Sequence, residues 1–218
     1  MEQIPRVSVI LFYDVNRGYL EQAIESFKND PFSAYCDLIQ IHSDQPSSAN
    51  INEGIRRAKG KYIRLLAEDD MLVAGGLRGL YNKAEQGFDV VVSSAINLRP
   101  DGTIETYVST LPHTVSQLAE SNTIHGGTVL YRADALRAVG GFDESLRYAE
   151  EFDLHLRLAA AGYRFGWLDM PTYVYRMHSH QKSMQGGYTD GEVYLQRKRE
   201  ILRTVVQKYN GNGTVIKK

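Results

Sequence analysis

Three carboxylates stand side by side in the segment "RLLAEDDML". Glu68, Asp69 and Asp70 follow a short apolar run that is typical of a buried strand. Adjacent carboxylates repel one another, and at the edge of a core they need a cation or hydrogen bonds as compensation. Carboxylate oxygens suit Mg²⁺ or Mn²⁺, which often take further oxygens from the phosphates of a substrate. Two interpretations stand: a metal site that holds a diphosphate, or a solvated turn that caps the next helix.

A second acidic cluster lies in "AEEFD", at the start of a predicted helix. Glu150 and Asp153 are three residues apart and share a helix face, and Glu151 lies between them. A carboxylate can act as a general base when it lies within hydrogen-bond reach of the proton it removes. An acidic first turn is also what the helix dipole alone favours.

A cationic segment, "YRMHSHQKS", follows a predicted strand near residue 176. Arg176 can bind phosphate oxygens with two parallel hydrogen bonds, and Lys182 adds a second positive charge. His178 can bind a metal ion or donate a hydrogen bond to a diphosphate. These side chains match the ligand that the first acidic cluster suggests.

The composition is that of a globular protein without a global charge bias. The 218 residues carry a formal net charge of -1, which predicts no nucleic-acid partner, and Cys36 is the only cysteine. No run approaches the roughly 20 apolar residues that a membrane span needs, and the start of the chain lacks a basic signal-peptide region. We expect a cytoplasmic protein. The basic segment after residue 197 allows peripheral contact with the inner face of a membrane.

Strand and helix patterns alternate through the first half, which predicts a Rossmann-like α/β fold with a mostly parallel sheet. The predicted strands cover 7–13, 37–42, 61–66 and 89–94, and the predicted helices cover 19–28, 51–60 and 77–84. The second half predicts a hairpin over 97–108, a helix over 149–163, and strands over 164–169 and 172–178. In open parallel sheets, ligands bind beyond the carboxyl ends of the strands, where the acidic triplet lies.

The segment "NEGIRRAKGKYIRLLAEDDML" resembles the N-x-G…A-x-G-x-Y-I…D-D stretch of family 2 glycosyltransferases. Three further segments resemble the same family in the same order, over about residues 5–185: "VSVILFYDVNRGYLEQAIESF", "YRADALRAVGGFDESLRYAEEFDLHLRLAAAGY" and "YRMHSHQKS". The resemblance implies a GT-A fold with a mostly parallel central sheet, a smaller acceptor-side sheet and a helical C-terminus. It implies a nucleotide-sugar-binding half over 1–98, an acceptor-binding and catalytic half over 99–189, and a basic helix and tail over 190–218.

The resemblance also implies an activity. Members of this family invert the anomeric centre as they move a sugar from a nucleotide diphosphate to an acceptor hydroxyl. We therefore expect a UDP-sugar as donor, Mn²⁺ or Mg²⁺ as cofactor, and a saccharide or lipid-linked saccharide as acceptor. Asp70 becomes the expected metal ligand, with Asp69 as the competing choice and His178 as a further one. Glu68 is expected on the ribose side, and Asp69, Arg176 and His178 on the donor.

On the acceptor side, the family position of the general base falls on Glu151, with Asp153 as a substitute. The expected acceptor-binding residues are His125, Gly126, Gly127 and Glu150. The two glycines would let an acceptor approach the backbone, although a tight turn explains them equally well.

The match is weakest where the family binds the nucleotide. The usual "P-T-Y-N" start is replaced by residues 12–15, and the usual Asp-Asp-Gly-Ser run by residues 42–45. We expect Tyr13 to stack on the base, Asp44 to accept a hydrogen bond from it, and Asn52 to contact the donor. The sequence leaves two rival interpretations open: a degenerate transferase fold that only binds a sugar or nucleotide, and a metal-dependent phosphohydrolase.

Overall fold

The computed structural model describes residues 4–109, 115–120, 123–182 and 191–210. Its strands are β1 (Val7–Tyr13), β2 (Cys36–His42), β3 (Tyr62–Ala67), β4 (Met71–Leu72), β5 (Val90–Leu98), β6 (Ile104–Tyr107), β7 (Leu130–Arg132) and β8 (Phe165–Arg176). Its α-helices are α1 (Leu20–Lys28), α2 (Ser47–Arg57), α3 (Gly76–Ala84), α4 (Val115–Glu120), α5 (Ala133–Ala138), α6 (Glu150–Ala160) and α7 (Gly191–Asn210). Two short 3₁₀ turns, η1 (Ser33–Tyr35) and η2 (Gly126–Thr128), complete the described elements.

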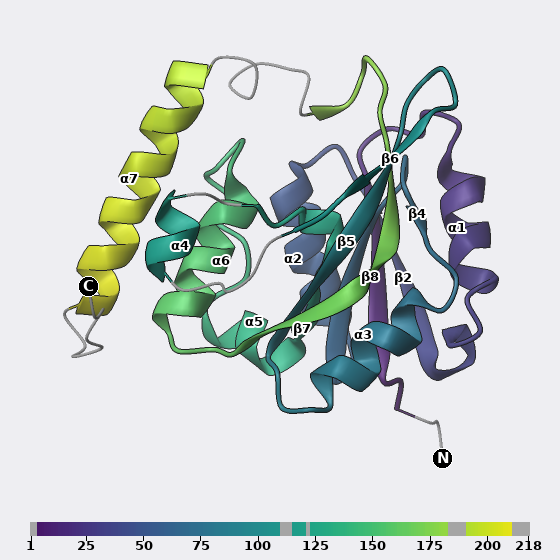
Figure 1. The fold of residues 1–218 in the computed structure, drawn as a ribbon, viewed down its shortest axis with the longest axis horizontal. Helices are drawn as coiled ribbons and strands as arrows, with labels where there is room; N and C mark the ends of the chain where they lie inside the picture. Colours follow the sequence, from purple (N-terminus) through teal and green to yellow (C-terminus); the bar gives the residue numbers. More distant parts are fainter. Residues whose placement is uncertain (1–3, 110–114, 121–122, 183–190, 211–218) are drawn as a thin grey trace.

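The described strands form one sheet in the order β2-β1-β3-β7-β5-β8-β4, with β6 paired to β5 (Figure 1). β1 pairs parallel with β2 and β3, as the alternating first half predicts. Beyond β3 the sheet is mixed: β8 runs parallel to β5, whereas β7, β6 and β4 pair antiparallel with their neighbours. The hairpin turn before β6 forces an antiparallel pairing, because a parallel one needs a long crossover. The predicted α/β fold with helices on a central sheet is confirmed, and one detail is corrected: the sheet is mixed rather than mostly parallel, and the strands expected in a smaller sheet belong to it.

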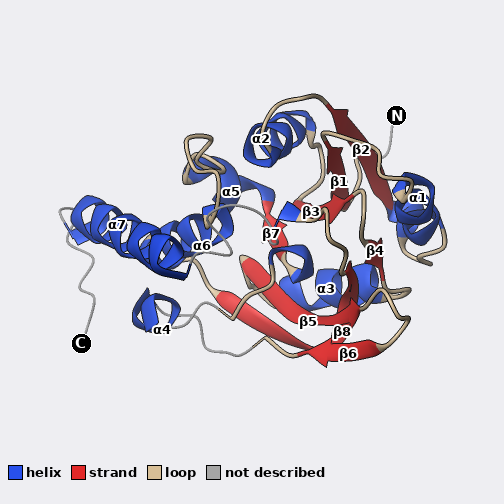
Figure 2. Ribbon diagram, turned by 90° about the horizontal axis from the view of Figure 1, so that it is seen from above, coloured by secondary structure: helices blue, strands red, loops and turns tan. Residues whose placement is uncertain are grey.

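Side chains that alternate along the central strands build a core on each face of the sheet. Val9 and Leu11 point to the face covered by α1 and α3, and Ile10 points to the face covered by α2, α5 and α6 (Figure 2). A Cβ on Gly54 of α2 would lie 2.4 Å from Cγ2 of Ile10. Only glycine lets α2 approach β1 this closely.

Two predicted elements have different bounds in the structure. Helix α2 begins at Ser47 rather than at 51, and Pro46 occupies the N-cap position directly before its first turn. The two strands expected over 164–169 and 172–178 are one strand, β8, whose pairing with β5 shifts register near Pro171. A proline cannot donate a hydrogen bond in the sheet, and it marks this irregularity.

Helix α7 lies at the periphery and packs against α6 (Figures 1 and 2). Its Ile201 and Val205 enter the core, so the expected basic C-terminal helix is a packed element. The tail over 211–218 lies outside the described residues, and the domain division predicted at 98 and 189 stays a prediction. Among the described residues, no helix combines the length and apolar character that crossing a bilayer requires.

Candidate active site

The acidic turn between β3 and β4 is buried. Glu68 is 2% exposed, Asp70 is 4% exposed, and Asp69 is partly buried. The N-terminus of the next helix, α3, is bound by a different acid: Asp30 Oδ2 accepts a hydrogen bond from the Gly75 N–H at 3.0 Å. The interpretation of residues 68–70 as a solvated helix cap is therefore wrong.

Asp70 uses both carboxylate oxygens on protein donors. The Tyr173 hydroxyl donates to Oδ2 and the Arg176 backbone N–H donates to Oδ1, each at 2.8 Å. Burial, together with the charge of Asp69, raises the pKa of Asp70 well above its usual value, and the two hydrogen bonds oppose that rise. The structure thus ties Asp70 to β8.

Glu68 is tied to the loop between β1 and α1. Its Oε1 accepts hydrogen bonds from the backbone N–H and from Nη1 of Arg17, both at 3.1 Å. Burial raises the pKa of Glu68, and the Arg17 hydrogen bonds oppose the shift. Its Oε2 is buried and has no hydrogen-bond partner among the described residues. An unsatisfied buried oxygen is uncommon, so this atom can accept a hydrogen bond from a ligand hydroxyl.

The cationic segment lies against the acidic turn, as the sequence predicts. His178 Nε2 lies 3.0 Å from Asp69 Oδ2, and Arg176 Nε donates to the backbone oxygen of Asp69 at 3.0 Å. Arg176 also donates to Gln22 Oε1 at 2.7 Å, and its guanidinium lies 4.4 Å from the ring centroid of Tyr19. The end of β8 therefore joins the acidic turn to α1. Ser183, the last residue of the quoted motif, lies outside the described residues.

Two residues expected to bind the base lie at or just after the carboxyl ends of β1 and β2. Tyr13 stacks on His42 with ring centroids 4.5 Å apart and planes 12° apart. Asp44 is exposed and accepts a hydrogen bond from Gln45 Nε2 at 3.2 Å. Both residues lie near the carboxyl edge of the sheet, where ligands of open α/β sheets bind.

Asn52 has a different setting from the one expected. Its Nδ2 donates to the Phe142 backbone oxygen at 2.9 Å and to Glu144 Oε1 at 2.8 Å, and its Oδ1 accepts from the Phe142 N–H at 2.9 Å. These bonds fasten α2 to the turn before α6. A donor-binding role for Asn52 stays a prediction.

The start of α6 sets Glu150 and Glu151 in unlike surroundings. Ala149, which precedes them, has φ 61°, a left-handed conformation that is uncommon for a residue with a side chain. Glu150 is buried and forms an ion pair with Lys182. Glu151 is partly buried, and burial followed by the charge of Glu150 raises its pKa to about 7, whereas Lys182 opposes the rise.

Asp153 is engaged within its own helix. Its Oδ2 accepts from Arg157 Nε at 2.8 Å and from Nη2 at 2.5 Å. Arg157 also donates to the backbone oxygens of Val139 and Gly141, each at 2.8 Å. The pair fastens α6 to the preceding turn. The substitute role of Asp153 stays a prediction.

The η2 turn lies between the two acidic clusters. A Cβ on Gly126 would lie 2.9 Å from Cγ of Glu151, and one on Gly127 would lie 2.2 Å from Cε1 of Tyr173, whose hydroxyl holds Asp70. The two glycines thus let both clusters approach the same turn. The chain passes through this gap with no room for a side chain.

His125 closes the η2 turn as a neutral side chain. Its Nδ1 accepts from the Gly127 N–H at 3.2 Å, and its ring lies 4.6 Å from that of Tyr175. Burial, with the nearby charge of Arg64, lowers the pKa of His125 to about 4. The imidazole is therefore uncharged at neutral pH.

Three residues of this site could not be found from sequence spacing. Each of them contacts the acidic turn or its support through residues at least 51 positions apart: Tyr173, Arg17 and Arg64. The only local signal is that Tyr173 precedes Arg176 by three residues in a strand that ends at the site.

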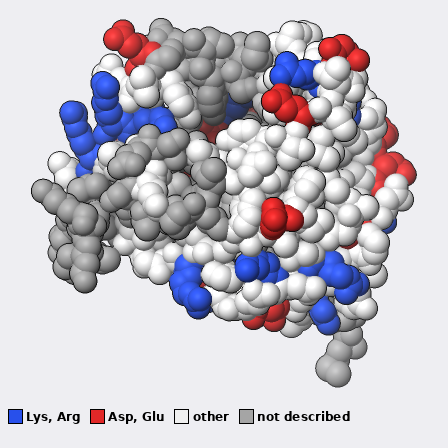
Figure 3. Space-filling model, in the orientation of Figure 1, with Lys and Arg blue, Asp and Glu red and all other residues white. Residues whose placement is uncertain are grey.

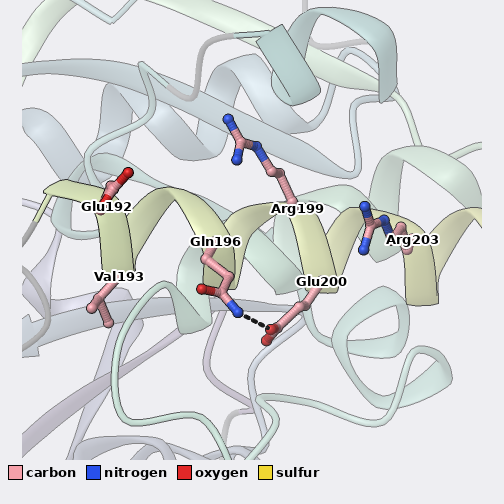
Figure 4. Close-up of a pocket in the computed structure, with 6 residues that line it drawn as sticks. All are labelled: Glu192, Val193, Gln196, Arg199, Glu200 and Arg203. Atoms are coloured by element: carbon pink, nitrogen blue, oxygen red, sulfur yellow. Dashed lines mark hydrogen bonds between the residues drawn. The ribbon is translucent and has the colours of Figure 1, made fainter.

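Two surface hollows lie away from the acidic turn and the start of α6. One runs along α7 and is lined by Glu192, Val193, Gln196, Arg199, Glu200 and Arg203, where Gln196 donates to Glu200 (Figure 4). The other lies beside β2 and α2 and includes His42, Ser43 and Asn50. Figure 3 shows Lys and Arg side chains at the edge where α7 lies, and mixed charges over the rest of that face. Neither hollow contains Asp70 or Glu151.

Comparison with known sequences decides the family. A family model described as "Glycosyl transferase family 2" matches residues 3–140, and one described as "Glycosyl transferase family group 2" matches residues 103–202. The chain belongs to glycosyl transferase family 2. The family 2 resemblance of the sequence is thereby confirmed.

Among curated proteins, this family 2 chain is 45% identical over 51 residues to the succinoglycan biosynthesis protein ExoA of Rhizobium meliloti (strain 1021). That match covers 23% of the chain and 16% of ExoA. The crystal structure of S. aureus TarS 1–349 in complex with UDP aligns with a TM-score of 0.68 at 14% identity, over 92% of this chain and 65% of that one. The complex of TarS 1–349 with UDP-GlcNAc aligns with a TM-score of 0.65 at 15% identity, over 92% and 71%. These likenesses confirm the GT-A-type fold.

Proposed function

We propose that this glycosyltransferase moves a sugar from a UDP-sugar to a hydroxyl of a saccharide or lipid-linked saccharide, with inversion and with Mn²⁺ or Mg²⁺. One observation carries the proposal. The acidic turn and the start of α6 meet on either side of the η2 turn, through the contacts of Gly126 with Glu151 and of Gly127 with Tyr173. An inverting transfer needs two such sides, because the diphosphate leaves from one face of the anomeric carbon while the acceptor hydroxyl attacks the other.

The donor side offers two candidate ligands for a divalent ion, and diphosphate oxygens and water would complete its coordination, because the described residues hold no group of three or more His, Cys, Asp or Glu side chains placed to bind a metal. Asp69 Oδ2 and His178 Nε2 lie 3.0 Å apart, the separation of two neighbouring ligands that are each about 2.1 Å from a magnesium-sized ion. In this proposal Asp69 and His178 hold the ion, and Asp70 supports the turn because its oxygens face protein donors. The bound ion supplies positive charge to the departing diphosphate.

Other side chains have donor roles in the proposal. Glu68 Oε2, which lacks a partner among the described residues, accepts from a ribose hydroxyl. Tyr13 offers a ring for the base, and Asp44 accepts from the base. Arg176, already next to the turn, adds charge stabilisation for the leaving diphosphate.

On the acceptor side, Glu151 acts as the general base. It removes the proton of the acceptor hydroxyl while the acceptor oxygen forms a bond to the anomeric carbon. The bond from that carbon to the diphosphate oxygen breaks on the opposite face, and the diphosphate leaves with the electron pair. A carboxylate with a pKa of about 7 suits this task, because a base works best when its pKa lies near the operating pH.

The relatives support the choice of donor and acceptor class. TarS structures contain UDP and UDP-GlcNAc, and ExoA is named for succinoglycan biosynthesis. We take from them a UDP-sugar donor and a role in polysaccharide biosynthesis. The match covers only 16% of ExoA, so the acceptor class is part of this proposal and is not a property carried over from ExoA.

A thermal-shift panel tests the donor assignment. UDP, GDP, ADP, TDP and their sugars are added with and without Mn²⁺, and a ligand that binds only the folded state raises the melting temperature. We expect one uridine diphosphate class to stabilise the protein in the presence of Mn²⁺. A flat panel would contradict the donor site. Release of inorganic phosphate from simple phosphoesters would instead support a phosphohydrolase.

The proposal includes a cytoplasmic location and contact of α7 with an anionic membrane. Arg199 and Arg203 are exposed on α7, as are the apolar side chains Val193 and Leu195. Sedimentation with vesicles that contain phosphatidylglycerol tests it. We expect binding that an R199E/R203E double variant loses, and equal binding of both proteins would contradict it.

A further inference from the structure

Tyr173, which no sequence motif singles out, links the acidic turn to the η2 turn. It lies in β8 with its backbone paired to β4 and β5, and its side chain is 2% exposed. Its hydroxyl donates to Asp70 Oδ2 at 2.8 Å and accepts from the Ala67 N–H at 3.3 Å. One phenol therefore holds both ends of the acidic turn.

The ring of Tyr173 also sets the wall of the η2 turn. A Cβ on Gly127 would lie 2.2 to 2.6 Å from three ring atoms of Tyr173, and the His125 ring lies 5.8 Å away. Any side chain at position 127 would push the ring, and with it the hydroxyl that binds Asp70. The acceptor-side turn and the donor-side carboxylate thus share one rigid contact.

A buried cation supports the ring from behind. Arg64 is fully buried, with Nη1 donating to the Val129 backbone oxygen at 3.0 Å and Nη2 to Thr172 Oγ1 at 3.2 Å. Its guanidinium lies 5.2 Å from the ring centroid of Tyr173. No carboxylate among the described residues forms an ion pair with it. Burying a charge without an acidic partner lowers the stability of the fold, so we expect Arg64 to have a role beneath the ring.

We propose that Tyr173, backed by Arg64, is a positioning residue that fixes Asp70 and the acidic turn in the geometry that Asp69 needs to hold the donor's ion. Side chains that orient metal-binding groups in this way commonly change metal affinity 10- to 100-fold when they are removed. This inference rests on the proposed function, because it presumes that Asp69 binds a divalent ion.

The experiment compares Y173F with Y62F. Y173F keeps the ring against Gly127 and Arg64 and removes only the hydroxyl. Tyr62 is a matched control: it is also 2% exposed, and its hydroxyl donates at 2.7 Å to Glu85, the residue after α3, outside the site. Mn²⁺ binding is measured by electron paramagnetic resonance without any acceptor, and melting temperatures are recorded for both variants. We expect Y173F to bind Mn²⁺ about tenfold more weakly than the parent and Y62F to match the parent.

A second variant tests the same contact without touching the hydroxyl. G127A should displace the ring and weaken Mn²⁺ binding in the same direction, whereas G79A, whose added Cβ meets only flexible Leu168 and Met170 side chains, should not. If the parent binds Mn²⁺ and both Y173F and G127A bind it as tightly, the positioning role is wrong and the proposed function survives. If the parent binds neither Mn²⁺ nor UDP, the proposed function fails and the positioning role fails with it.

Discussion

The two acidic clusters contain the same number of carboxylates and use them differently. In the turn after β3, every acid has a partner in the structure: Glu68 binds Arg17, Asp69 meets His178, and Asp70 binds Tyr173. At the start of α6, Glu150 and Asp153 each form an ion pair with a basic side chain. Burial raises the pKa of the third acid, Glu151. The first arrangement suits a place that receives positive charge, and the second suits a base.

The three acids in the first turn of α6 differ in their partners. Glu150 pairs with Lys182 and Asp153 with Arg157, whereas Glu151 forms no ion pair with any described residue. Burial and the charge of Glu150 raise the pKa of Glu151 to about 7. Pairing its neighbours therefore leaves Glu151 as the carboxylate that can gain and release a proton near neutral pH.

The largest effect is expected from removing the base. Glu151→Gln should lower kcat by about 10²- to 10⁴-fold, the range for loss of general base catalysis, with UDP affinity unchanged. In the parent, kcat/KM should rise with pH and level off above about pH 7, because only the ionised form of Glu151 accepts a proton. Initial rates of UDP release from pH 5.5 to 9 check both. A variant with parental kcat would exclude Glu151 as the base.

The same variant has a predicted effect on stability. The folded-state pKa of Glu151 lies above its usual 4.5, so its contribution to the free energy of unfolding is lost as pH rises through about 7. Glu151→Gln should therefore be at least as stable as the parent at pH 8, measured by urea denaturation. Marked destabilisation would instead make Glu151 a structural residue.

The next effect concerns the donor cluster. Asp69→Asn should weaken Mn²⁺ binding and lower kcat/KM by about 100-fold, because it removes one charged ligand and leaves a similar shape. Asp134→Asn is a matched control with the same chemical change at an exposed position on α5. Calorimetric titration of UDP with Mn²⁺ distinguishes them, and equal behaviour of the two variants would move the ion away from Asp69.

A smaller effect should come from Lys182. Its positive charge lowers the pKa of Glu151, so Lys182→Met should move the midpoint of the pH profile to higher pH and reduce the rate at pH 7 by a few-fold. The plateau rate at high pH should stay close to that of the parent. Lys83→Met, on α3, is the control, and a midpoint that does not move would show that Lys182 is electrostatically remote from the base.

The smallest effect on turnover is expected at Asp153. Asp153→Asn breaks a buried pair with Arg157 and should lower the free energy of unfolding by about 3 kcal/mol. The kcat of the folded variant should match the parent. Denaturation curves and initial rates at 15 °C separate the two quantities. A large loss of kcat without a loss of stability would give Asp153 the catalytic role that the sequence allowed.

The sequence predicts the elements that carry these clusters because their signals are local. The apolar run of β1 and the stripe of α3 have the periods of a strand and a helix, and both appear in the structure. The family motifs predicted that Arg176 and His178 would lie near the acids. The pair of Asp153 with Arg157 also has a local signal, since the two residues are four apart on one helix.

The rest depends on contacts that no local pattern encodes. The antiparallel insertion of β7 between β3 and β5 could not be predicted, because three residues carry no pairing preference of their own. The contact of Tyr173 with Asp70 spans 103 positions, and the burial of Arg64 follows from packing between β3 and β8. The raised pKa of Glu151 likewise follows from burial in the folded chain, which no spacing in the sequence encodes.

The central claim is that the acidic turn and the start of α6 serve one donor and one acceptor on opposite sides of the η2 turn. An anomalous difference map from a crystal soaked with Mn²⁺ and UDP tests it most directly. The account predicts a manganese peak within about 2.3 Å of Asp69 and His178, with the diphosphate beside Arg176 and the Glu151 carboxylate facing the space beyond it. A peak bound only elsewhere, with Asp69 and His178 still paired to each other, would contradict it.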